Sequence, residues 1–150
     1  MSFSSPSDRV PDDHPLRRLK DMANCALKKL SKDFGKMYSS TGWSSIPPGK
    51  LIRSLLLQVL YSIHSERLFL EQLDYNLLFR WFVGLGMDED VWDLTTFSKS
   101  CERLFKAAIV PKFFSRIREE AQEYGLLSDE HFTLDKMWIE ALASQKSFPR

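Results

Sequence analysis

The stretch 51–63 constrains the fold most strongly, because apolar side chains cover a wide face of the helix that its periodicity predicts. Only a narrow polar strip remains, so this helix needs neighbours around most of its circumference. We therefore predict a central core helix, with Pro47 and Pro48 in its first turn and Ser44 or Ser45 as its cap. The apolar face holds Leu51, Ile52, Leu55, Leu56, Val59, Leu60 and Ile63, and the polar strip holds Lys50, Ser54, Gln58, Tyr61 and Ser62.

Segments with helical periodicity precede and follow this core helix. Apolar residues recur through 16–37 with lysines and arginines on the opposite face, which predicts a helix that Gly35 and the cluster 39–42 bring to an end. The stretch 65–83 carries more apolar mass than one stripe can hold, so it predicts one or two short helices buried on two sides. Gly84 is the expected end of that segment.

Two further helices are expected in the second half of the chain. The acidic run 88–90 caps a predicted turn at 91–92, and Thr95 or Thr96 is the expected cap of the next helix. The last helix covers 111–124. In the first of the two helices, Phe97, Cys101, Leu104, Phe105 and Ala108 are predicted inward, and Lys99, Glu102, Arg103 and Lys106 outward.

The character of the sequence changes after Gly125. Residues 131–139 are rich in Phe, Thr, Trp and Ile, which predicts a β-strand. A lone strand cannot satisfy its own backbone groups, so it pairs with another molecule or belongs to a larger sheet. The predicted fold class is mostly α, with a disordered tail over 1–15, a helical domain over 16–125 and one orphan strand within 126–150.

The charge balance excludes a basic field over the whole protein. Lys and Arg number 21 against 20 Asp and Glu, a net charge of +1, so any basic patch is local. Residues 1–37 hold eight basic and five acidic side chains, which suits a solvated helix face as well as a phosphate-binding one. Hydrophobic residues make up 43% of the chain, which excludes a disordered protein.

The cysteines and the N-terminal segment indicate a cytoplasmic protein. Cys25 and Cys101 have no spacing typical of a disulfide framework or a zinc site, and both fall on apolar helical positions. The first fifteen residues contain no apolar core of a signal peptide. The most apolar run is too short to span a bilayer, so no membrane contact is expected.

Few residues point to catalysis by their spacing. His14, His64 and His131 are scattered, and surface or core histidines explain them better than metal ligands. Asp135 interrupts the predicted strand, and two interpretations stay open. An edge strand would leave the carboxylate in water, whereas a two-metal site would use it as a ligand.

Several short motifs occur in order along the chain. They are PPGKLIRSLLLQVLYSI at 47–63, Ser65-Glu66-Arg67, Glu71-Gln72-Leu73, Leu78-Phe79-Arg80-Trp81-Phe82 with Gly84-Leu85, Thr96-Phe97-Ser98-Lys99, GLLSDEHFT at 125–133 leading into Asp135, Ile139-Glu140-Ala141 and Ala143-Ser144. Together these motifs resemble the N-terminal region of insertion-sequence-five-type DDE transposases. The similarity extends over roughly 14–148 in the family order.

The resemblance implies a helical region that binds element-end DNA, followed by an RNase H-like domain. Asp135 matches the first Asp of the DDE triad, although Lys136 and Met137 stand where the family usually has Gly-Thr. The family continues beyond Arg150, and the second Asp and the Glu lie in that later part. We therefore expect a truncated transposase without strand-transfer activity of its own. Mg²⁺ is the metal of the intact family, and no cofactor is expected for this chain.

The resemblance also implies candidate DNA contacts. The helix around 95–106 would serve as the second helix of a helix-turn-helix-like unit, with double-stranded terminal repeats as its partner. An ordinary charged helix face is the alternative. The outward candidates are Ser98, Lys99, Arg103 and Lys106, and the secondary candidates for backbone contacts are Arg17, Arg18, Lys28, Lys29 and Lys32.

Two other functions stay open. The aromatic-rich stretch 68–82 could form a dimer interface, which would make the chain a protein-interaction module that binds no DNA. A homodimer or co-assembly with intact transposase is also compatible with DNA binding. The remaining possibility is an inert remnant of a transposable element.

Overall fold

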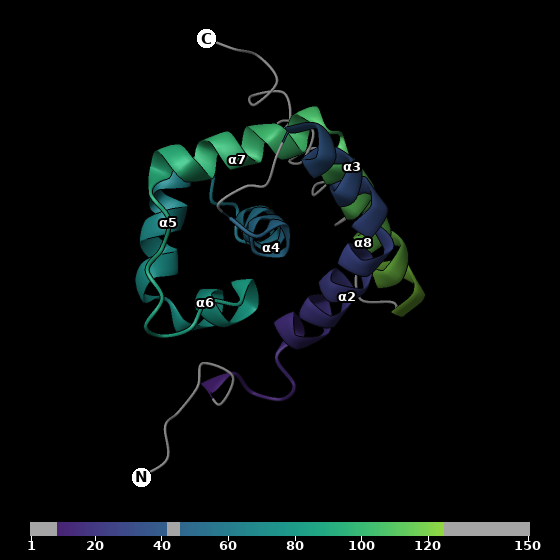
Figure 1. The fold of residues 1–150 in the computed structure, drawn as a ribbon. Coiled ribbons are helices and arrows are strands. Elements are labelled where there is room, and N and C mark those ends of the chain that lie inside the picture. Colours follow the sequence, from purple (N-terminus) through teal and green to yellow (C-terminus); the bar gives the residue numbers. More distant parts are fainter. Residues whose placement is uncertain (1–8, 42–45, 125–150) are drawn as a thin grey trace.

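The computed structural model describes residues 9–41 and 46–124 (Figure 1). Regular structure in these residues is helical, which confirms the mostly-α prediction for this part of the chain. The predicted strand at 131–139 and the domain at 126–150 lie outside the described residues. The helices are α2 (Pro15–Lys29), α3 (Ser31–Thr41), α4 (Pro48–Leu60), α5 (Glu66–Tyr75), α6 (Leu77–Val83), α7 (Leu94–Lys106) and α8 (Ile109–Tyr124).

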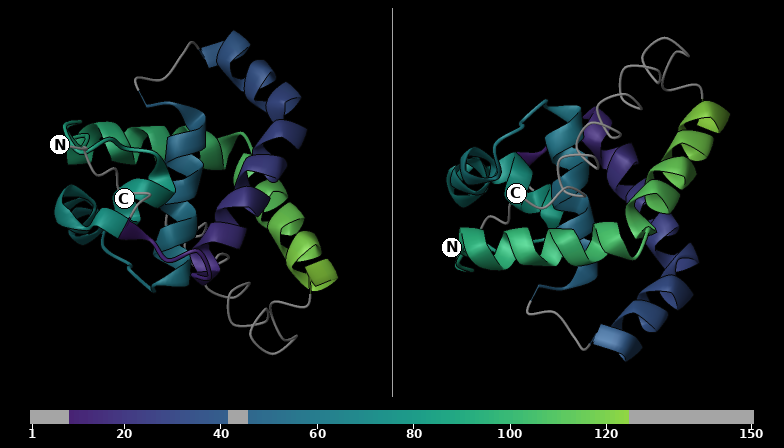
Figure 2. Two further views of the ribbon diagram at one scale, coloured as in Figure 1. Left: turned by 90° about the horizontal axis from the view of Figure 1, so that it is seen from below. Right: turned by 90° about the horizontal axis from the view of Figure 1, so that it is seen from above.

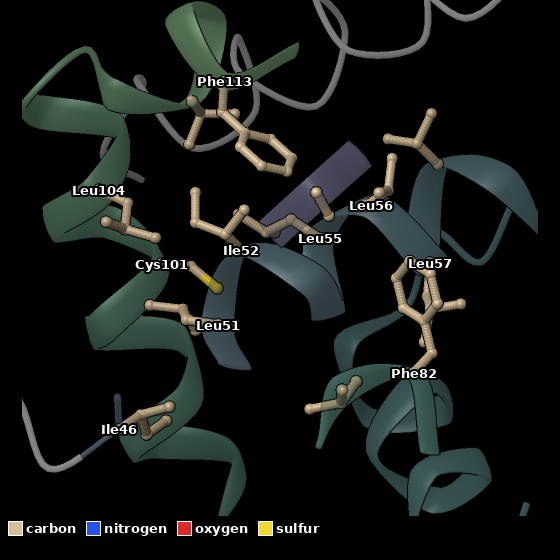
Figure 3. Packing of buried hydrophobic residues seen from close by; sticks show 14 of the residues in the cluster. Ile46, Leu51, Ile52, Leu55, Leu56, Leu57, Phe82, Cys101, Leu104 and Phe113 are labelled. Atoms are coloured by element: carbon tan, nitrogen blue, oxygen red, sulfur yellow. The ribbon is translucent and has the colours of Figure 1, made fainter. Parts of the chain in front are cut away.

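Helix α4 is the core of the fold, as its wide apolar face predicts. Figure 1 shows it nearly end-on, with the other helices around it. Apolar side chains of α4 meet Phe82 of α6, Cys101 and Leu104 of α7 and Phe113 of α8 (Figure 3). The fully or almost fully buried residues of α4 include Leu51, Ile52, Leu55, Leu56 and Leu57.

The predicted polar strip of α4 is wrong at two positions. Ser54 and Gln58 are completely buried because neighbouring elements cover this side of the helix as well. The Ser54 hydroxyl donates to the Lys50 carbonyl at 2.8 Å, and the Gln58 amide donates to the Ile63 carbonyl at 3.3 Å. Both side chains thus find backbone acceptors close in sequence, although Oε1 of Gln58 has no hydrogen-bond partner among the described residues.

The N-cap position of α4 differs from the expected one. The N-cap residue is Pro47, which makes no side-chain capping hydrogen bond, and the predicted caps Ser44 and Ser45 lie outside the described residues. Proline suits the first turn because the missing N–H would have no helical partner there.

The single helix predicted over 16–37 is two helices. Leu30, with φ −97° and ψ 8°, separates α2 from α3, and the chain changes direction there (Figure 1). Leu30, Phe34 and Met37 are nevertheless buried, so the apolar periodicity continues across the break. Gly35 lies inside α3 and does not end it. The pattern of buried positions shows which side of a helix faces the core, but it does not show a one-residue break in the helix.

The prediction of one or two short helices at 65–83 is confirmed, and the structure has two, α5 and α6. The Ser65 hydroxyl accepts a hydrogen bond from the Leu68 amide at the start of α5, and the Asn76 side chain accepts one from the Phe79 amide in α6. Gly84 ends α6 in the left-handed region at φ 97°, as expected.

The boundaries of the last two helices differ from the prediction. Asp93, and neither threonine, caps α7, since its carboxylate accepts from the Thr96 amide at 3.1 Å. Residues 91–92 form no helical turn. Helix α8 begins at Ile109, and Ala108, predicted inward, is exposed in the turn before it with φ 58°. Both views of Figure 2 show α8 beside α2, with which it is in contact.

Candidate nucleic-acid interface

Helix α7 carries the principal DNA-binding candidates, and it lies at an edge of the fold (Figure 1). Its inner side packs on α4, α5 and α8 through Phe97, Cys101 and Leu104, all completely buried. Its outer side presents exposed residues at helical spacing. This outer stripe of α7 consists of Thr95, Lys99, Glu102 and Lys106.

The two lysines of the outer stripe are available for an external ligand. Among the described residues, neither the Lys99 nor the Lys106 ammonium makes a hydrogen bond or an ion pair. Some other lysines are engaged, since Lys29 lies 3.5 Å from Glu120 and Lys112 lies 2.9 Å from Asp33. The exposed Lys28 and Lys32 resemble the two lysines of the stripe in this respect, but they lie on α2 and α3. The stripe therefore presents two unpaired cations and one carboxylate.

Ser98 and Arg103 have internal partners, although the sequence predicts both as DNA contacts. The half-buried Ser98 hydroxyl donates to the Glu66 carboxylate at 2.7 Å and so links α7 to α5. The Arg103 guanidinium lies 5.5 Å from the centre of the Tyr38 ring and so links α7 to α3. The predicted outward position of Arg103 is correct only in part, because its side chain is half-buried.

Cations gather where α3 meets the turn between α7 and α8. The hydrogen bond from Lys112 lowers the pKa of Asp33, and the charges of Lys112 and Lys36 lower it further. Arg103 lies over Tyr38 of the same helix α3.

The secondary candidates on α2 lie away from α7. Arg17 donates to the Pro11 carbonyl at 3.0 Å and to the Val10 carbonyl at 2.6 Å, so it holds the segment before α2 in place. Arg18 is exposed on the same helix. Figure 1 shows the start of α2 and α7 at opposite edges of the molecule. The structure therefore does not join Arg17 and Arg18 to the α7 candidates in one surface.

The remaining secondary candidates are exposed. Lys28 lies near the end of α2 and Lys32 lies in α3, both at the surface. Lys29 is exposed too, although its ammonium is engaged with Glu120.

A group of cations at the end of α6 was not predicted from the sequence. The Lys20 ammonium donates to the Trp81 carbonyl at 2.6 Å, and the Arg53 guanidinium donates to the Val83 carbonyl at 3.1 Å. One signal was present in the sequence, since a charged residue inside the apolar run of a core helix needs a partner. We call this group the cationic junction, and it consists of Arg17, Lys20, Lys50 and Arg53.

The connection before α7 is longer than in compact helix-turn-helix proteins. Residues 84–93 separate α6 from α7, whereas the usual turn has roughly three to four residues. A short turn at 107–108 joins α7 to α8. The helix-turn-helix-like unit with α7 as its second helix therefore stays a prediction.

Asp135, the candidate catalytic carboxylate, lies outside the described residues. In the ranges 9–41 and 46–124, no group of three or more His, Cys, Asp or Glu side chains is placed to hold a metal ion. The same ranges contain no helix with the length and apolarity needed to cross a membrane.

Comparison with known proteins identifies the family. Residues 4–103 match the family model described as Transposase domain (DUF772), so the match includes α2 to α6 and most of α7. No curated protein and no solved structure matches the chain. The insertion-sequence-five type suggested by the motifs stays a prediction. Because the family model covers two thirds of the sequence, the chain belongs to the DUF772 transposase-domain family.

Proposed function

We propose that this transposase-family chain binds double-stranded DNA at the ends of its element through the outer stripe of α7. The observation that carries the proposal is the pair of exposed lysines, Lys99 and Lys106, which have no partner among the described residues. Lysines that neutralise phosphates release condensed counterions, and this release supplies most of the sequence-independent affinity for DNA.

The spacing of the two lysines suits contacts to separate phosphates. Lys99 and Lys106 lie two turns apart on one side of α7, about 10 Å along the axis at roughly 1.5 Å per residue. Glu102 lies between them and weakens the local positive field. The expected binding is therefore modest in affinity and strongly dependent on salt.

We further propose that the described helices bind and position DNA and that catalysis depends on other residues. Strand transfer needs two metal ions held by several carboxylates. The resemblance supplies Asp135 as one such ligand, and this role stays a proposal. The helical region would then serve end binding and assembly, as in the family that the motifs resemble.

A titration followed by fluorescence anisotropy tests the DNA-binding proposal. A labelled terminal repeat from the neighbouring genomic element is compared with a scrambled duplex at low and moderate salt. The variant Lys99→Gln/Lys106→Gln removes both unpaired charges, and Arg67→Gln on α5 removes one exposed charge elsewhere as the control. We expect tighter binding to the repeat, weakened in the double variant and unchanged in the control. Equal affinity of the wild type and the double variant would contradict the proposal.

A second candidate function is self-association through α5. Most of the apolar stretch 68–82 is buried inside the chain, but Leu68 is 47% exposed and Tyr75 is 62% exposed. The two residues lie two turns apart on α5, so they share one side of that helix. Light scattering after gel filtration, with Leu68→Glu/Tyr75→Glu as the variant, separates a dimer from a monomer. A monomeric wild type at high protein concentration would exclude this function.

A further inference from the structure

The cationic junction brings four positive side chains from two helices to the C-terminal end of α6. Two of them cap backbone carbonyls there: Lys20 donates to Trp81 and Arg53 to Val83. Arg53 also holds α2, because its Nε and Nη2 groups donate to the Asn24 side chain at 3.2 and 2.6 Å. The junction thus ties α2, α4 and α6 together.

All four cations of the junction surround the short segment 81–84. The Lys20 ammonium lies 4.6 Å and the Arg17 guanidinium 5.2 Å from the centre of the Trp81 ring. At Gly84, a Cβ atom would lie 3.5 Å from Nη1 of Arg53 and 4.0 Å from Cε of Lys50. Arg17 and Lys20 are one turn apart on α2, and Lys50 and Arg53 are one turn apart on α4.

Positive charge is in excess at the junction. The nearby carboxylates are Glu89, 3.2 Å from the Lys50 ammonium, and Asp21, whose charge raises the pKa of Lys20. Burial lowers the pKa of Lys20, and the charges of Arg53 and Arg17 lower it further. The end of α6 adds roughly half a negative charge. Each cation has a partner within the chain, since Arg17 donates to the Val10 and Pro11 carbonyls and Lys50 pairs with Glu89. The four cations nevertheless outnumber the two nearby carboxylates.

We propose that the cationic junction binds a backbone phosphate of duplex DNA, as a second contact surface separate from the outer stripe of α7. This inference rests on the proposed DNA-binding function. Two cation pairs, each spanning one helical turn, provide several donors from two directions, which suits phosphate oxygens. The junction is only partly open to water, with the Lys50 side chain 25% exposed, so salt screens its charges less than it screens the outer stripe.

The two surfaces can be tested independently because α7 lies on one side of the central helix α4 and the end of α6 and the start of α2 lie on the other (Figure 1). The starting protein is the full chain with Lys99→Gln/Lys106→Gln, in which the outer stripe has lost its cations. Lys50→Gln is then added. Lys50 is partly exposed and its ion-pair partner Glu89 is half-exposed, so the fold should survive this change. Lys20→Gln is a second addition, Lys20→Arg is its charge-preserving counterpart, and Arg67→Gln is the control. Circular dichroism melting checks each variant for folding.

Trp81 provides a local signal, since two cations lie against its ring and it is only 8% exposed. Replacing Trp43, Trp92 and Trp138 by Phe leaves Trp81 as the single tryptophan. A phosphate that attracts Lys20 or Arg17 alters the charge against the indole and hence its emission. The probe is a random-sequence DNA duplex. A parallel titration with inorganic phosphate alone tests whether the site binds a free anion.

If the junction binds phosphate, the duplex should change the fluorescence emission of Trp81 in the variant Lys99→Gln/Lys106→Gln. Adding Lys50→Gln or Lys20→Gln should weaken binding about tenfold and reduce the slope of log Kd on log salt by about 0.9 for each lost contact. Lys20→Arg and Arg67→Gln should retain binding. Unchanged emission, or equal affinity with and without Lys50→Gln, would overturn the inference and leave the proposed function intact. A change produced by inorganic phosphate but not by the duplex would overturn it too.

The same variants also show whether DNA binding through the outer stripe of α7, the proposed function, is wrong. If Lys99→Gln/Lys106→Gln binds DNA as tightly as the wild type while Lys50→Gln removes binding, the junction is the DNA surface and the outer stripe is not. If no form binds DNA, both the function and the inference are wrong.

Discussion

The Ser98 hydroxyl donates a hydrogen bond of 2.7 Å to the carboxylate of Glu66. Ser98 belongs to α7 and Glu66 begins α5, so this contact fixes how the candidate DNA-binding helix is seated on its neighbour. From the sequence, Ser98 is predicted to be a DNA contact. The structure gives it an internal role, and the two roles lead to different results on mutation.

Ser98→Ala should lower the stability of the protein and leave DNA affinity almost unchanged. A hydrogen bond to a charged group contributes about 2 kcal/mol to the free energy of unfolding. Urea unfolding measures the loss, with Ser115→Ala on the exposed surface of α8 as the control, where little change is expected. A variant of wild-type stability that binds DNA more weakly would restore Ser98 to the DNA surface.

Arg80→Met should be among the most destabilising substitutions in the chain. The nearly buried guanidinium donates to the carbonyls of Asp74 at 2.7 Å, Gly86 at 2.7 Å and Glu89 at 3.0 Å, so it holds the connection between α6 and α7. Methionine fills the volume but leaves these carbonyls without their donor, which should lower the unfolding free energy by about 3 kcal/mol.

The control for Arg80→Met is Arg67→Met, which changes an exposed side chain. Thermal melting of both variants gives the comparison. Equal melting temperatures would mean that water replaces the guanidinium at no cost and that Arg80 does not organise the connection.

Gly35→Ala and Gly84→Ala should change stability in opposite directions. Gly35 lies inside α3, and a Cβ there meets no atom within 4 Å, so alanine should stabilise the helix by about 1 kcal/mol. Gly84 ends α6 at φ 97°, where a Cβ is strained, and alanine should lower stability by about 1–2 kcal/mol. Denaturant midpoints of the two variants measure both effects. A loss at Gly35 would indicate that the glycine is needed for a reason outside the helix geometry.

Helical periodicity predicted most of the fold. An apolar pattern over seven or more residues indicates which face of a helix is buried. The core position of α4 and the helical structure at 65–83 could therefore be predicted from the sequence. The break at Leu30 could not, because the apolar pattern continues unchanged across it. The burial of Ser54 and Gln58 also depends on elements far along the chain, which periodicity within one helix does not contain.

The candidate site could be predicted only in part for the same reason. Lys99 and Lys106 occupy the middle of the outward side of α7, where no neighbour reaches, and their exposure follows from spacing alone. Ser98 and Arg103 lie at the borders of that side, where α5 and α3 decide what is covered. Arg53 is a charged residue within an apolar run, but the run does not reveal its partners, which come from α2 and α6.

The capping residue of α7, Asp93, should make the free energy of unfolding depend on pH in the acidic range. The hydrogen bonds from the Thr96 hydroxyl and amide hold the pKa of Asp93 below its ordinary value of 3.8. A carboxyl whose pKa is depressed in the folded state contributes stability above its unfolded pKa and loses it as the pH falls through the folded value. Asp93→Asn keeps a capping oxygen but cannot ionise.

The difference in unfolding free energy between the wild type and Asp93→Asn should therefore be constant near neutral pH and shrink as the pH falls below about 3.8. Urea unfolding at a series of pH values gives this difference directly. Thr95→Ser, at an exposed position in the first turn of α7, is the control, because it changes no ionisable group. If the difference for Asp93→Asn did not vary with pH, ionised Asp93 would contribute nothing beyond a neutral cap, and its charge would have no part in holding the start of the candidate DNA-binding helix.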